Sequence, residues 1–462
     1  MENFKALLIQ VEDLVWGPPL LILFMGVGLY LTYKLKAIQL RYLPYALKLA
    51  FGPQTEDHKD STIRGGISPF QSLMTGLAAT IGIGNIAGVA TAVMTGGLGA
   101  LFWMWVTALL GMATRFSESV LAVKYRTHNS AGELIGGPMY YIEKGIGWKW
   151  LAICFAIFGS IAAIGTGNMV QINSVSQALH MLFGWQEVII GFVLCILTGL
   201  MLFQGIKSIG KVSAVLVPIM AVFYVMGGLI ILAIHYQKIP KAFMLIMTSA
   251  FTGQAALGGF LGATVMSAIQ MGVARGIFSN ESGLGSAPIA AAAAKTNSPV
   301  RQAMISMTGS FVATIVVCSI TGFVIAVTQT MGLLDAQGKA LNGMALTIKA
   351  FEISLPGGGY IVTIGAILFA YSTVLGWAYY GEKCFEYLCG EKLSVTYRWL
   401  YILTTIPAAT IDLELIWRFA DIANGLMAFP NLIAVFILAP VVVEETQEFL
   451  RIKTVKDRFN KP

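Results

Sequence analysis

The stretch "ATIGIGNIAGVATAV", residues 79–93, lies in an apolar part of the chain but is rich in glycine. It holds Gly82, Gly84 and Gly88, with the polar Asn85 among them. A helix that only crosses a membrane would favour Leu and Ile at these positions. Backbone groups without helical partners are tolerated at membrane depth only where protein covers them or where they line a polar cavity. The stretch therefore predicts a membrane helix that is interrupted in its middle.

The composition is that of a membrane protein. Of the 462 residues, 56% are hydrophobic and 11% are charged, and the mean hydropathy is +0.75. A soluble domain carries about 25% charged residues. Apolar runs of about 18 or more residues recur along the whole chain, which predicts transmembrane helices. The first run is long enough to span and follows acidic residues, so we expect no cleavable signal peptide.

We expect an all-α polytopic protein with eleven transmembrane helices. The predicted spans are about 14–34, 70–95, 99–124, 150–179, 186–204, 210–235, 262–294, 302–330, 358–381, 394–411 and 414–442. With the N-terminus outside, 22 of the 30 Lys and Arg residues fall in inside segments and six fall in outside segments. This split favours an outside N-terminus and a cytoplasmic C-terminus, because Lys and Arg gather in cytoplasmic loops.

A second stretch, "ARGIFSNESGLGSAP" at residues 274–288, interrupts another apolar span with polar residues and glycines. The two broken spans are the second and the seventh, so they begin two sets of five. Five is odd, and the second set therefore has the inverted orientation. Glycine-interrupted segments at matching places of inverted halves point to a transporter's binding site. The alternative is that both are small-residue packing faces, which does not explain the polar run Ser279–Ser282.

This interpretation divides the chain into four segments. They are an extra N-terminal helix with a cytoplasmic linker (1–66), a first five-helix repeat (67–235), a second five-helix repeat with an outer lid (236–443) and a cytoplasmic tail (444–462). Two outer connections, 236–261 and 331–357, contain amphipathic pieces. These pieces are either lids over an outer mouth or helices that rest on the membrane surface.

Three stretches carry a resemblance to a known family. "GGLGALFWMWVTALLG" (96–111), "GNIAGVATAV" (84–93) and the stretch 274–288 resemble the alanine or glycine:cation symporter family. That family is similar to the leucine-transporter fold, with one extra helix ahead of a 5+5 inverted repeat. The resemblance implies sodium-driven uptake of alanine or glycine across a bacterial-type cytoplasmic (inner) membrane, with protons as the coupling ion in some members. The chain has Ile83 where the family often has Thr, which removes a hydroxyl group.

An amino-acid zwitterion needs donors for its carboxylate, acceptors for its ammonium group and a pocket fitted to its side chain. Gly82 and Gly84 let backbone N–H groups approach the carboxylate, and Asn85 offers both an amide oxygen and an amide N–H group. The other expected substrate contacts are Thr80, Gln171, Phe278, Ser279, Asn280, Thr373 and Trp377. For the amides the alternative is a helix–helix hydrogen bond, and for Trp377 it is core packing.

The resemblance implies Na⁺ as the coupling ion and no organic cofactor. In the related fold the Asn at the position of Asn85 coordinates sodium near the substrate. Two adjacent hydroxyls of span nine and carbonyls of the first broken helix also form a sodium site there; in this chain they correspond to Ser372, Thr373 and the carbonyl of Ile81. Sodium is a hard cation that prefers oxygen ligands. The alternative is that the hydroxyls bond to their own helix.

Charged side chains inside membrane spans are rare and usually functional. We expect an ion pair between Arg275 and Glu281, although Glu281 would also suit a cation directly. Arg115 and Glu118 are three residues apart, which predicts an intrahelical ion pair. Asp421 is a candidate for an outer gate. The five cysteines match no metal or redox motif and are expected to be small apolar core residues.

The expected function is secondary active symport of a small neutral amino acid with Na⁺, by alternating access. The expected partners are this substrate and the bilayer, with no nucleic acid and no obligatory protein partner. One alternative is a carrier of the same fold for a larger amino acid or a nucleobase, and another is a proton-coupled variant. An ion channel would need an open polar file, whereas the polar clusters lie at one depth. A membrane enzyme lacks support because no catalytic or metal grouping is present in the sequence.

Overall fold

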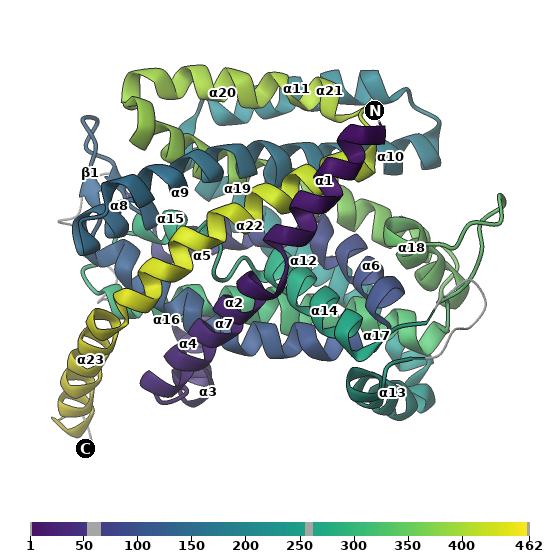
Figure 1. Cartoon of the computed structure of the whole chain (residues 1–462), viewed down its shortest axis with the longest axis horizontal. Coiled ribbons are helices and arrows are strands. Elements are labelled where there is room, and N and C mark those ends of the chain that lie inside the picture. The colour runs from purple at the N-terminus through teal and green to yellow at the C-terminus, as the bar shows by residue number, and fades with distance from the viewer. Residues whose placement is uncertain (1, 53–65, 255–261, 460–462) are drawn as a thin grey trace.

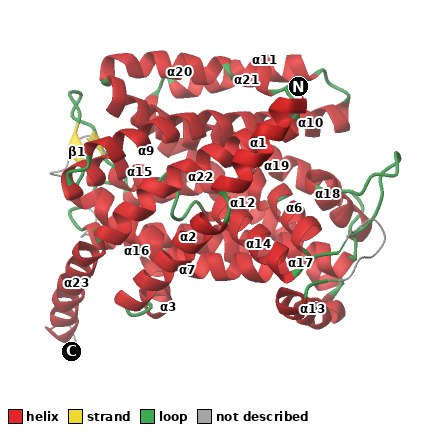
Figure 2. Ribbon diagram, in the orientation of Figure 1, coloured by secondary structure: helices red, strands yellow, loops and turns green. Residues whose placement is uncertain are grey.

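The computed structural model describes residues 2–52, 66–254 and 262–459. Most of these residues are helical (Figure 2), and one short antiparallel hairpin pairs β1 (Thr127–His128) with β2 (Leu134–Ile135). Two parts of the predicted segments, 53–65 in the linker and 255–261 in an outer connection, lie outside the described residues.

Seven helices among the described residues are long and apolar enough to cross a membrane. They are Ala6–Lys34, Gly99–Lys124, Lys149–His180, Gly205–Ile234, Pro299–Thr328, Gly358–Cys389 and Leu415–Ile437. Each coincides with a predicted span. The other four predicted spans are either broken, at 70–95 and 262–294, or contain shorter helices, at 186–204 and 394–411. The count of eleven spans and the inverted repeat therefore stay predictions.

The helix over the opening stretch is broken, as the sequence predicted. It consists of α5 (Pro69–Thr80), a short 3-10 turn (Ile83–Asn85) and α6 (Ala87–Gly96). α5 starts with a capping box in which the Ser68 hydroxyl accepts from the N–H group of Gln71 at 3.1 Å. The carbonyl end of α5 and the first N–H groups of α6 are left in the interior, and they need partners from elsewhere in the fold.

The second predicted interruption is also present. α14 (Val265–Asn280) ends before α15 (Ala287–Ala292) begins. Between them the backbone has positive φ at Glu281 (55°), Gly283 (84°) and Gly285 (81°). Glycine adopts this left-handed region easily, whereas other residues seldom do. The two glycines thus let the chain turn inside the protein, and Glu281 is held there by side-chain contacts.

Two long helices contain π-helical segments. The parts of the first are α9 (Lys149–Ala162), the π segment Ala163–Met169 and α10 (Val170–Phe183), and the parts of the second are α16 (Pro299–Ser310), the π segment Phe311–Cys318 and α17 (Ser319–Thr328). A π turn shifts the backbone pairing by one residue, and such turns frequently occur at functional sites.

The remaining helices complete the bundle around these elements. They are α1 (Glu2–Val15), α2 (Pro18–Lys34), α3 (Ile38–Arg41), α4 (Leu43–Phe51), α7 (Gly99–Lys124), α8 (Pro138–Tyr141), α11 (Glu187–Leu202), α12 (Gly205–Ile234), α13 (Ile239–Thr252), α18 (Gly343–Ser354), α19 (Gly358–Cys389), α20 (Ser394–Leu403), α21 (Thr405–Ala408), α22 (Leu413–Ile437) and α23 (Ala439–Phe459). α7 lies in the interior and packs against α14 and α16, whereas α12 is mostly on the outside.

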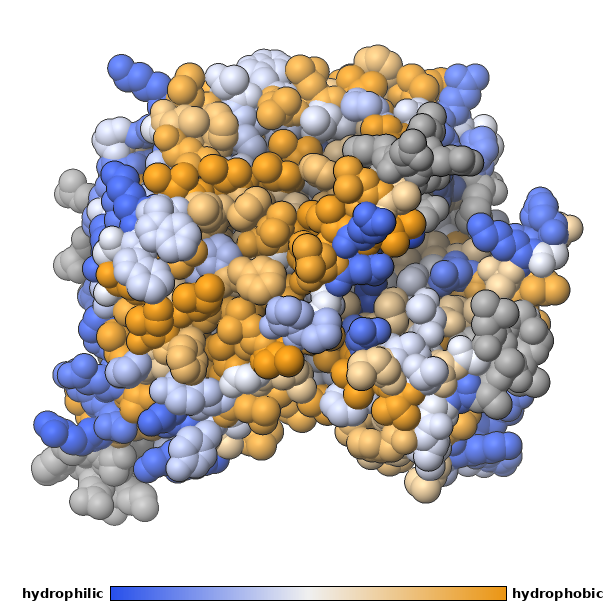
Figure 3. Space-filling model, viewed as in Figure 1, coloured by the Kyte–Doolittle hydropathy of each residue, from blue (hydrophilic) through white to orange (hydrophobic). Residues whose placement is uncertain are grey.

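The surface has the pattern of a membrane protein. α1 begins at the top of Figure 1, right of its centre, whereas α23 ends at the lower left. Hydrophobic residues cover the middle of the face seen in Figure 3, and hydrophilic residues gather toward its left and right ends. Such a band suits the apolar core of a bilayer if the long axis of the molecule runs from one side of the membrane to the other.

Candidate functional site

The two chain breaks contact each other in the interior of the molecule. Asn85 in the first break donates from Nδ2 to Ser279 Oγ near the end of α14, at 2.8 Å. A Cβ atom on Gly84 would lie 2.7 Å from the Phe278 ring, so glycine is needed for this close approach. Asn85 and Ser279 are fully buried. The structure therefore brings these four predicted site residues together.

Two amide side chains cap the free N–H groups of the first break. Asn85 Oδ1 accepts from the N–H group of Gly82 at 3.0 Å, and Gln171 Oε1 accepts from the N–H group of Ile83 at 3.1 Å. The caps satisfy donors that an unbroken helix would pair internally. The two capped donors thus belong to Gly82 and Ile83, whereas the sequence had suggested Gly82 and Gly84.

The same two amides are anchored by carbonyl groups of the π-helical segments. Gln171 Nε2 donates to the carbonyl of Thr166 at 3.1 Å, and Asn85 Nδ2 donates to the carbonyl of Ala313 at 3.0 Å. Each amide therefore holds the first break with its oxygen and a π segment with its nitrogen. This arrangement gives the π segments a direct role in shaping the site.

Oxygen atoms of α5 and α19 gather beside the first break. Thr373 Oγ1 lies 3.0 Å from the carbonyl oxygen of Ala78 and 3.4 Å from that of Ile81. Ser372 Oγ lies 3.2 Å from the same Ala78 oxygen and 2.9 Å from the carbonyl oxygen of Phe369, so this hydroxyl also bonds to its own helix, as the alternative had it. This set of hydroxyl and carbonyl oxygens, which we call the oxygen cluster, suits a hard cation. The hydrogen bonds of Asn85 lead to other groups, so Asn85 and the oxygen cluster are separate candidates for Na⁺.

A buried glutamate occupies the second break. The Glu281 carboxylate accepts from Trp377 Nε1 at 2.7 Å and from Ser286 Oγ at 2.9 Å. Trp377 is 1% exposed, and its indole group connects α19 to the second break. Its hydrogen bond therefore belongs to the second break and not to the amide-capped donors of the first.

Arg115 of α7 lies between the two breaks. Its Nη1 donates to the carbonyl of Asn280 at 2.8 Å and to Thr80 Oγ1 at 3.3 Å. A cation at the carbonyl end of a helix is favourable because of the helix dipole. The Asn280 side chain accepts from the N–H group of Ser282 at 3.0 Å, just beyond the end of α14. Thr80 and Asn280 thus have partners around Arg115 rather than around Gly82.

The predicted ion pair between Arg275 and Glu281 is wrong. Arg275 pairs instead with Asp421 of α22 through two hydrogen bonds, at 2.7 and 3.2 Å. α14 ends between Arg275 and Glu281, and the left-handed backbone of Glu281 turns the chain. The Glu281 carboxylate consequently meets α19, whereas Arg275 faces α22.

The predicted intrahelical pair between Arg115 and Glu118 is also wrong. Within the described residues Arg115 donates to the end of α14, while Glu118 Oε1 accepts from Asn431 Nδ2 at 2.5 Å. A spacing of three residues permits a pair on an exposed helix. On the buried helix α7 each side chain finds a partner on another element.

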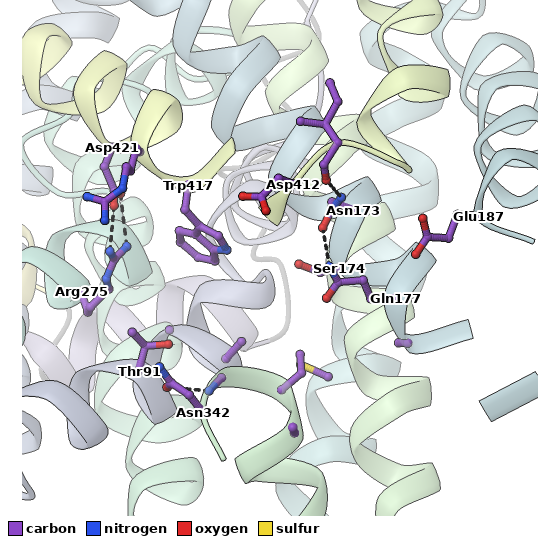
Figure 4. A pocket seen from close by; sticks show the side chains of 18 of the residues that line it. Thr91, Asn173, Ser174, Gln177, Glu187, Arg275, Asn342, Asp412, Trp417 and Asp421 are labelled. Atoms are coloured by element: carbon purple, nitrogen blue, oxygen red, sulfur yellow. Dashed lines mark hydrogen bonds and ion pairs between the residues drawn. The ribbon is translucent and has the colours of Figure 1, made fainter. Parts of the chain in front are cut away.

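A cavity of about 800 Å³ lies between α6, α10, α14, α18 and α22 (Figure 4). Its residues labelled in the figure are Thr91, Asn173, Ser174, Gln177, Glu187, Arg275, Asn342, Asp412, Trp417 and Asp421. Gly82, Asn85 and Ser279 are not part of its lining. The candidate site is therefore close to a polar cavity but closed off from it.

An aromatic and ionic layer separates this cavity from the first break. The ring centroids of Phe278 and Trp417 lie 5.0 Å apart. The Arg275 guanidinium lies 5.0 Å from the Trp417 centroid and 5.7 Å from the Phe278 centroid, while it also pairs with Asp421. Cation–π contacts and an ion pair thus hold the layer together. The sequence had named Asp421 as an outer-gate candidate, and this is its structural setting.

The opposite end of the broken helices is tied by backbone hydrogen bonds. The N–H group of Ile67 donates to Ala293 O at 3.0 Å, and the N–H group of Lys295 donates to Ile67 O at 2.8 Å. Arg126 donates to the carbonyls of Ala294 and Thr296 at 2.7 and 2.5 Å. The Ile67 bonds join the start of α5 to the segment after α15, and the Arg126 bonds join the end of α7 to the same segment. The broken helices are therefore held together on this side.

Thr314, Cys318, Trp417 and the carbonyl of Ala78 take part in the site but were missed in the sequence. Ser279 Oγ lies 2.9 Å from Cys318 Sγ and 3.4 Å from Thr314 Oγ1. Thr314 stands alone in an apolar run, which was a faint signal. Cys318 is buried, as expected of an apolar residue, but it makes polar contacts. Trp417 gave no signal, because its sequence context does not distinguish a gate residue from a core tryptophan.

Comparisons with known proteins agree on one family. The model of the sodium:alanine symporter family matches residues 1–461. The sodium/alanine symporter AgcS of Methanococcus maripaludis is 53% identical over 458 residues, with 98% of each chain covered. An uncharacterized transporter of Haemophilus influenzae is 50% identical over 452 residues, with 97% of each chain covered. The crystal structure of MhsT in complex with L-phenylalanine has a TM-score of 0.57 at 12% identity, over 83% of this chain and 99% of that one, which shows a shared fold.

Proposed function

The chain belongs to the sodium:alanine symporter family, and from that premise we propose that it couples inward Na⁺ movement to uptake of alanine or glycine by alternating access. The observation that carries the proposal is the contact between two broken helices beside an oxygen cluster. Members of this family are membrane transporters and not enzymes. The residue roles below are proposed from the contacts of the described residues.

The substrate carboxylate binds to the N–H groups of Gly82 and Ile83. In the described structure these groups are capped by the amide oxygens of Asn85 and Gln171, at 3.0 and 3.1 Å. A carboxylate oxygen accepts such a hydrogen bond more strongly than an amide oxygen does. The substrate therefore displaces the caps, and the released Gln171 oxygen becomes an acceptor for the substrate ammonium group.

Na⁺ binds at the oxygen cluster. The Thr373 hydroxyl now donates toward the carbonyl of Ala78, and the Ser372 hydroxyl donates toward the carbonyl of Phe369 on its own helix. When Na⁺ enters, these hydrogens rotate away and the lone pairs of the hydroxyls face the ion together with the carbonyls of Ala78 and Ile81. Because Ile81 directly precedes Gly82, an ion at the cluster fixes the backbone that holds the carboxylate. Each ligand thus raises the affinity for the other, as coupling requires. A second Na⁺ position adjoins Asn85.

The size of the substrate is limited by Phe278. Its ring lies against Gly84, where a Cβ atom would come within 2.7 Å of the ring. A substrate whose carboxylate sits at Gly82 carries its side chain into the same space. The side chains of alanine and glycine fit without moving the ring, whereas a larger side chain has to displace Phe278 from Trp417.

Alternating access uses the two closures on either side of the site. The layer of Phe278, Trp417 and Arg275 separates the site from the cavity, and the bonds of Ile67 and Arg126 close the other end. We infer that the cavity is the outer vestibule, which agrees with an outside N-terminus and a cytoplasmic C-terminus in the inner membrane. Opening toward the cytoplasm then breaks the Ile67 bridge.

Uptake into proteoliposomes tests this function. Labelled alanine and glycine are offered with a Na⁺ gradient alone, a proton gradient alone, or neither. We expect accumulation with the Na⁺ gradient alone, and competition by alanine and glycine that exceeds competition by glutamine or a nucleobase. Accumulation driven only by a proton gradient would show that protons and not Na⁺ are the coupling ion. Stronger competition by glutamine or a nucleobase would show that alanine and glycine are not the preferred substrates.

A further inference from the structure

Three ionisable side chains are buried around the second break. Arg115 and Glu118 of α7 are 1% and 0% exposed, and Glu281 is 2% exposed. If all three were ionised, this group would carry one positive and two negative charges. An excess charge in such surroundings costs several kcal/mol unless something neutralises it. The cluster therefore requires one further positive charge, which is either a proton or another cation.

The hydrogen bonds identify which carboxyl group is neutralised. Glu281 accepts from Trp377 Nε1 and from Ser286 Oγ, at 2.7 and 2.9 Å, which favours its ionised form. Glu118 accepts from Asn431 Nδ2 with one oxygen, and the backbone N–H groups of Gly283 and Gly285 also face its carboxyl group, but its buried Oε2 makes no well-formed hydrogen bond among the described residues. Arg115 points its Nη1 donor at neutral acceptors. Of the two carboxyl groups, only Glu118 has a buried oxygen, Oε2, that no hydrogen bond stabilises among the described residues, so Glu118 is the group that we assign the proton.

We propose that Glu118 is a proton-binding site, which holds its proton in the conformation described here and releases it during the transport cycle. The groups that face it are Arg115 from its own helix, Tyr141 from α8, the Asn431 amide from α22 and the backbone N–H groups of Gly283 and Gly285 from the second break. Glu281 lies across Arg115 on the second break. Arg115 is the only cation among these groups, and within the described residues it is the nearest positive charge to both Glu118 and Glu281.

The proton is linked to the second break through Asn431. The Asn431 Nδ2 that donates to Glu118 also donates to the carbonyl of Gly283, at 2.8 Å, and the Asn431 oxygen accepts from the Tyr141 hydroxyl. Gly283 is one of the left-handed residues of the break, with φ of 84°. Ionised Glu118 needs water, and water reaches it only when the elements around Gly283 separate. Proton release therefore accompanies opening of the second break.

Infrared spectroscopy of the purified full chain in lipid tests the proton directly and independently of transport. At neutral pH we expect a carbonyl stretching band of a protonated carboxylic acid. The band disappears in Glu118→Gln and persists in Glu281→Gln. Absence of the band in the unmodified protein overturns the proposal even if the variants fold poorly, and so does a band that persists in Glu118→Gln.

Uptake measurements then test release. Proteoliposomes hold the unmodified protein or Glu118→Gln, and the pH on the cytoplasmic side is varied at a fixed Na⁺ gradient. Acidification on that side slows uptake by the unmodified protein by up to about tenfold per pH unit, because the pH sets the ionised fraction of a single group. Uptake by Glu118→Gln stays independent of this pH. Equal pH profiles for the two proteins contradict proton release, whereas loss of all Na⁺-driven uptake in the unmodified protein contradicts the proposed function instead.

Discussion

At each of the two helix breaks, backbone groups lose their helical partners, and different kinds of side chain bond to them. In the first break neutral amides, Asn85 and Gln171, cap the free N–H groups. In the second break the ionisable Arg115 and Glu281 hold the chain ends. A ligand oxygen can replace a neutral cap at small cost, whereas removal of one member of a buried charged set leaves an uncompensated charge and costs about 3–5 kcal/mol. The first break is therefore suited to bind and release a ligand, and the second to support the fold and respond to protons.

The strongest test of this contrast is a methyl group in the first break. A Cβ atom on Gly82 would lie 2.6 Å from Thr373 Oγ1 and 3.1 Å from Gln171 Oε1. We expect Gly82→Ala to lower the initial rate of labelled alanine uptake by about 100-fold or more, since overpacking of about 3 kcal/mol corresponds to that factor. Gly26→Ala is the control, because a Cβ atom there meets nothing within 4 Å and Gly26 of α2 does not line the cavity. Similar losses in both variants would remove the special role of Gly82.

The oxygen cluster is tested by Thr373→Ala. Loss of one ligand to an ion costs about 1.5–3 kcal/mol, so the Na⁺ concentration for half-maximal uptake rises about 10- to 100-fold. Thr363→Ala is the control on the same helix, because the hydroxyl of Thr363 is also buried but bonds to the carbonyl of Gly359. An unchanged Na⁺ dependence in Thr373→Ala would show that Na⁺ does not bind at the oxygen cluster.

The aromatic and ionic layer between the cavity and the first break is tested by a double-mutant cycle of Arg275→Gln and Asp421→Asn. The side chains are 13% and 6% exposed and face a cavity, so each single change removes a partly buried partner. We expect each to slow uptake about tenfold, and the double variant to recover part of the loss because no unpaired charge remains. Strictly additive effects on the uptake rate would show that the ion pair between Arg275 and Asp421 does not contribute to transport.

The smallest effect on uptake is expected at the second break. Trp377→Phe removes the indole donor to the ionised Glu281, which lowers the free energy of unfolding by about 1.5–3 kcal/mol. Because Trp377 does not touch the capped N–H groups, the half-saturation concentrations of Na⁺ and alanine stay within about twofold, a change below 0.5 kcal/mol. Thermal unfolding and uptake are measured together. Trp105→Phe is the control, since its indole donates to Ser319 outside both breaks. A large change in alanine affinity in Trp377→Phe would indicate that Trp377 contacts the substrate, as the sequence analysis predicted.

Much of the architecture could be predicted because it follows from local composition. The long apolar runs gave the membrane helices, and the glycines and polar residues at 82–85 and 279–285 gave both breaks. The pairing partners could not be predicted in the same way. Arg275 and Glu281 are near in sequence, but the end of α14 separates them, and both found partners on other helices. The π segments that anchor Gln171 and Asn85 have no clear pattern in the sequence either.

The sequence alone determined which segments form long apolar helices and where two helices break, since hydropathy and backbone freedom are properties of a residue and its neighbours. Only the tertiary structure decided which oxygen caps each free N–H group, which carboxyl group receives the arginine and which end of the site is closed. Those choices depend on helix packing, because a buried polar atom must bond to whatever group the neighbouring helix presents.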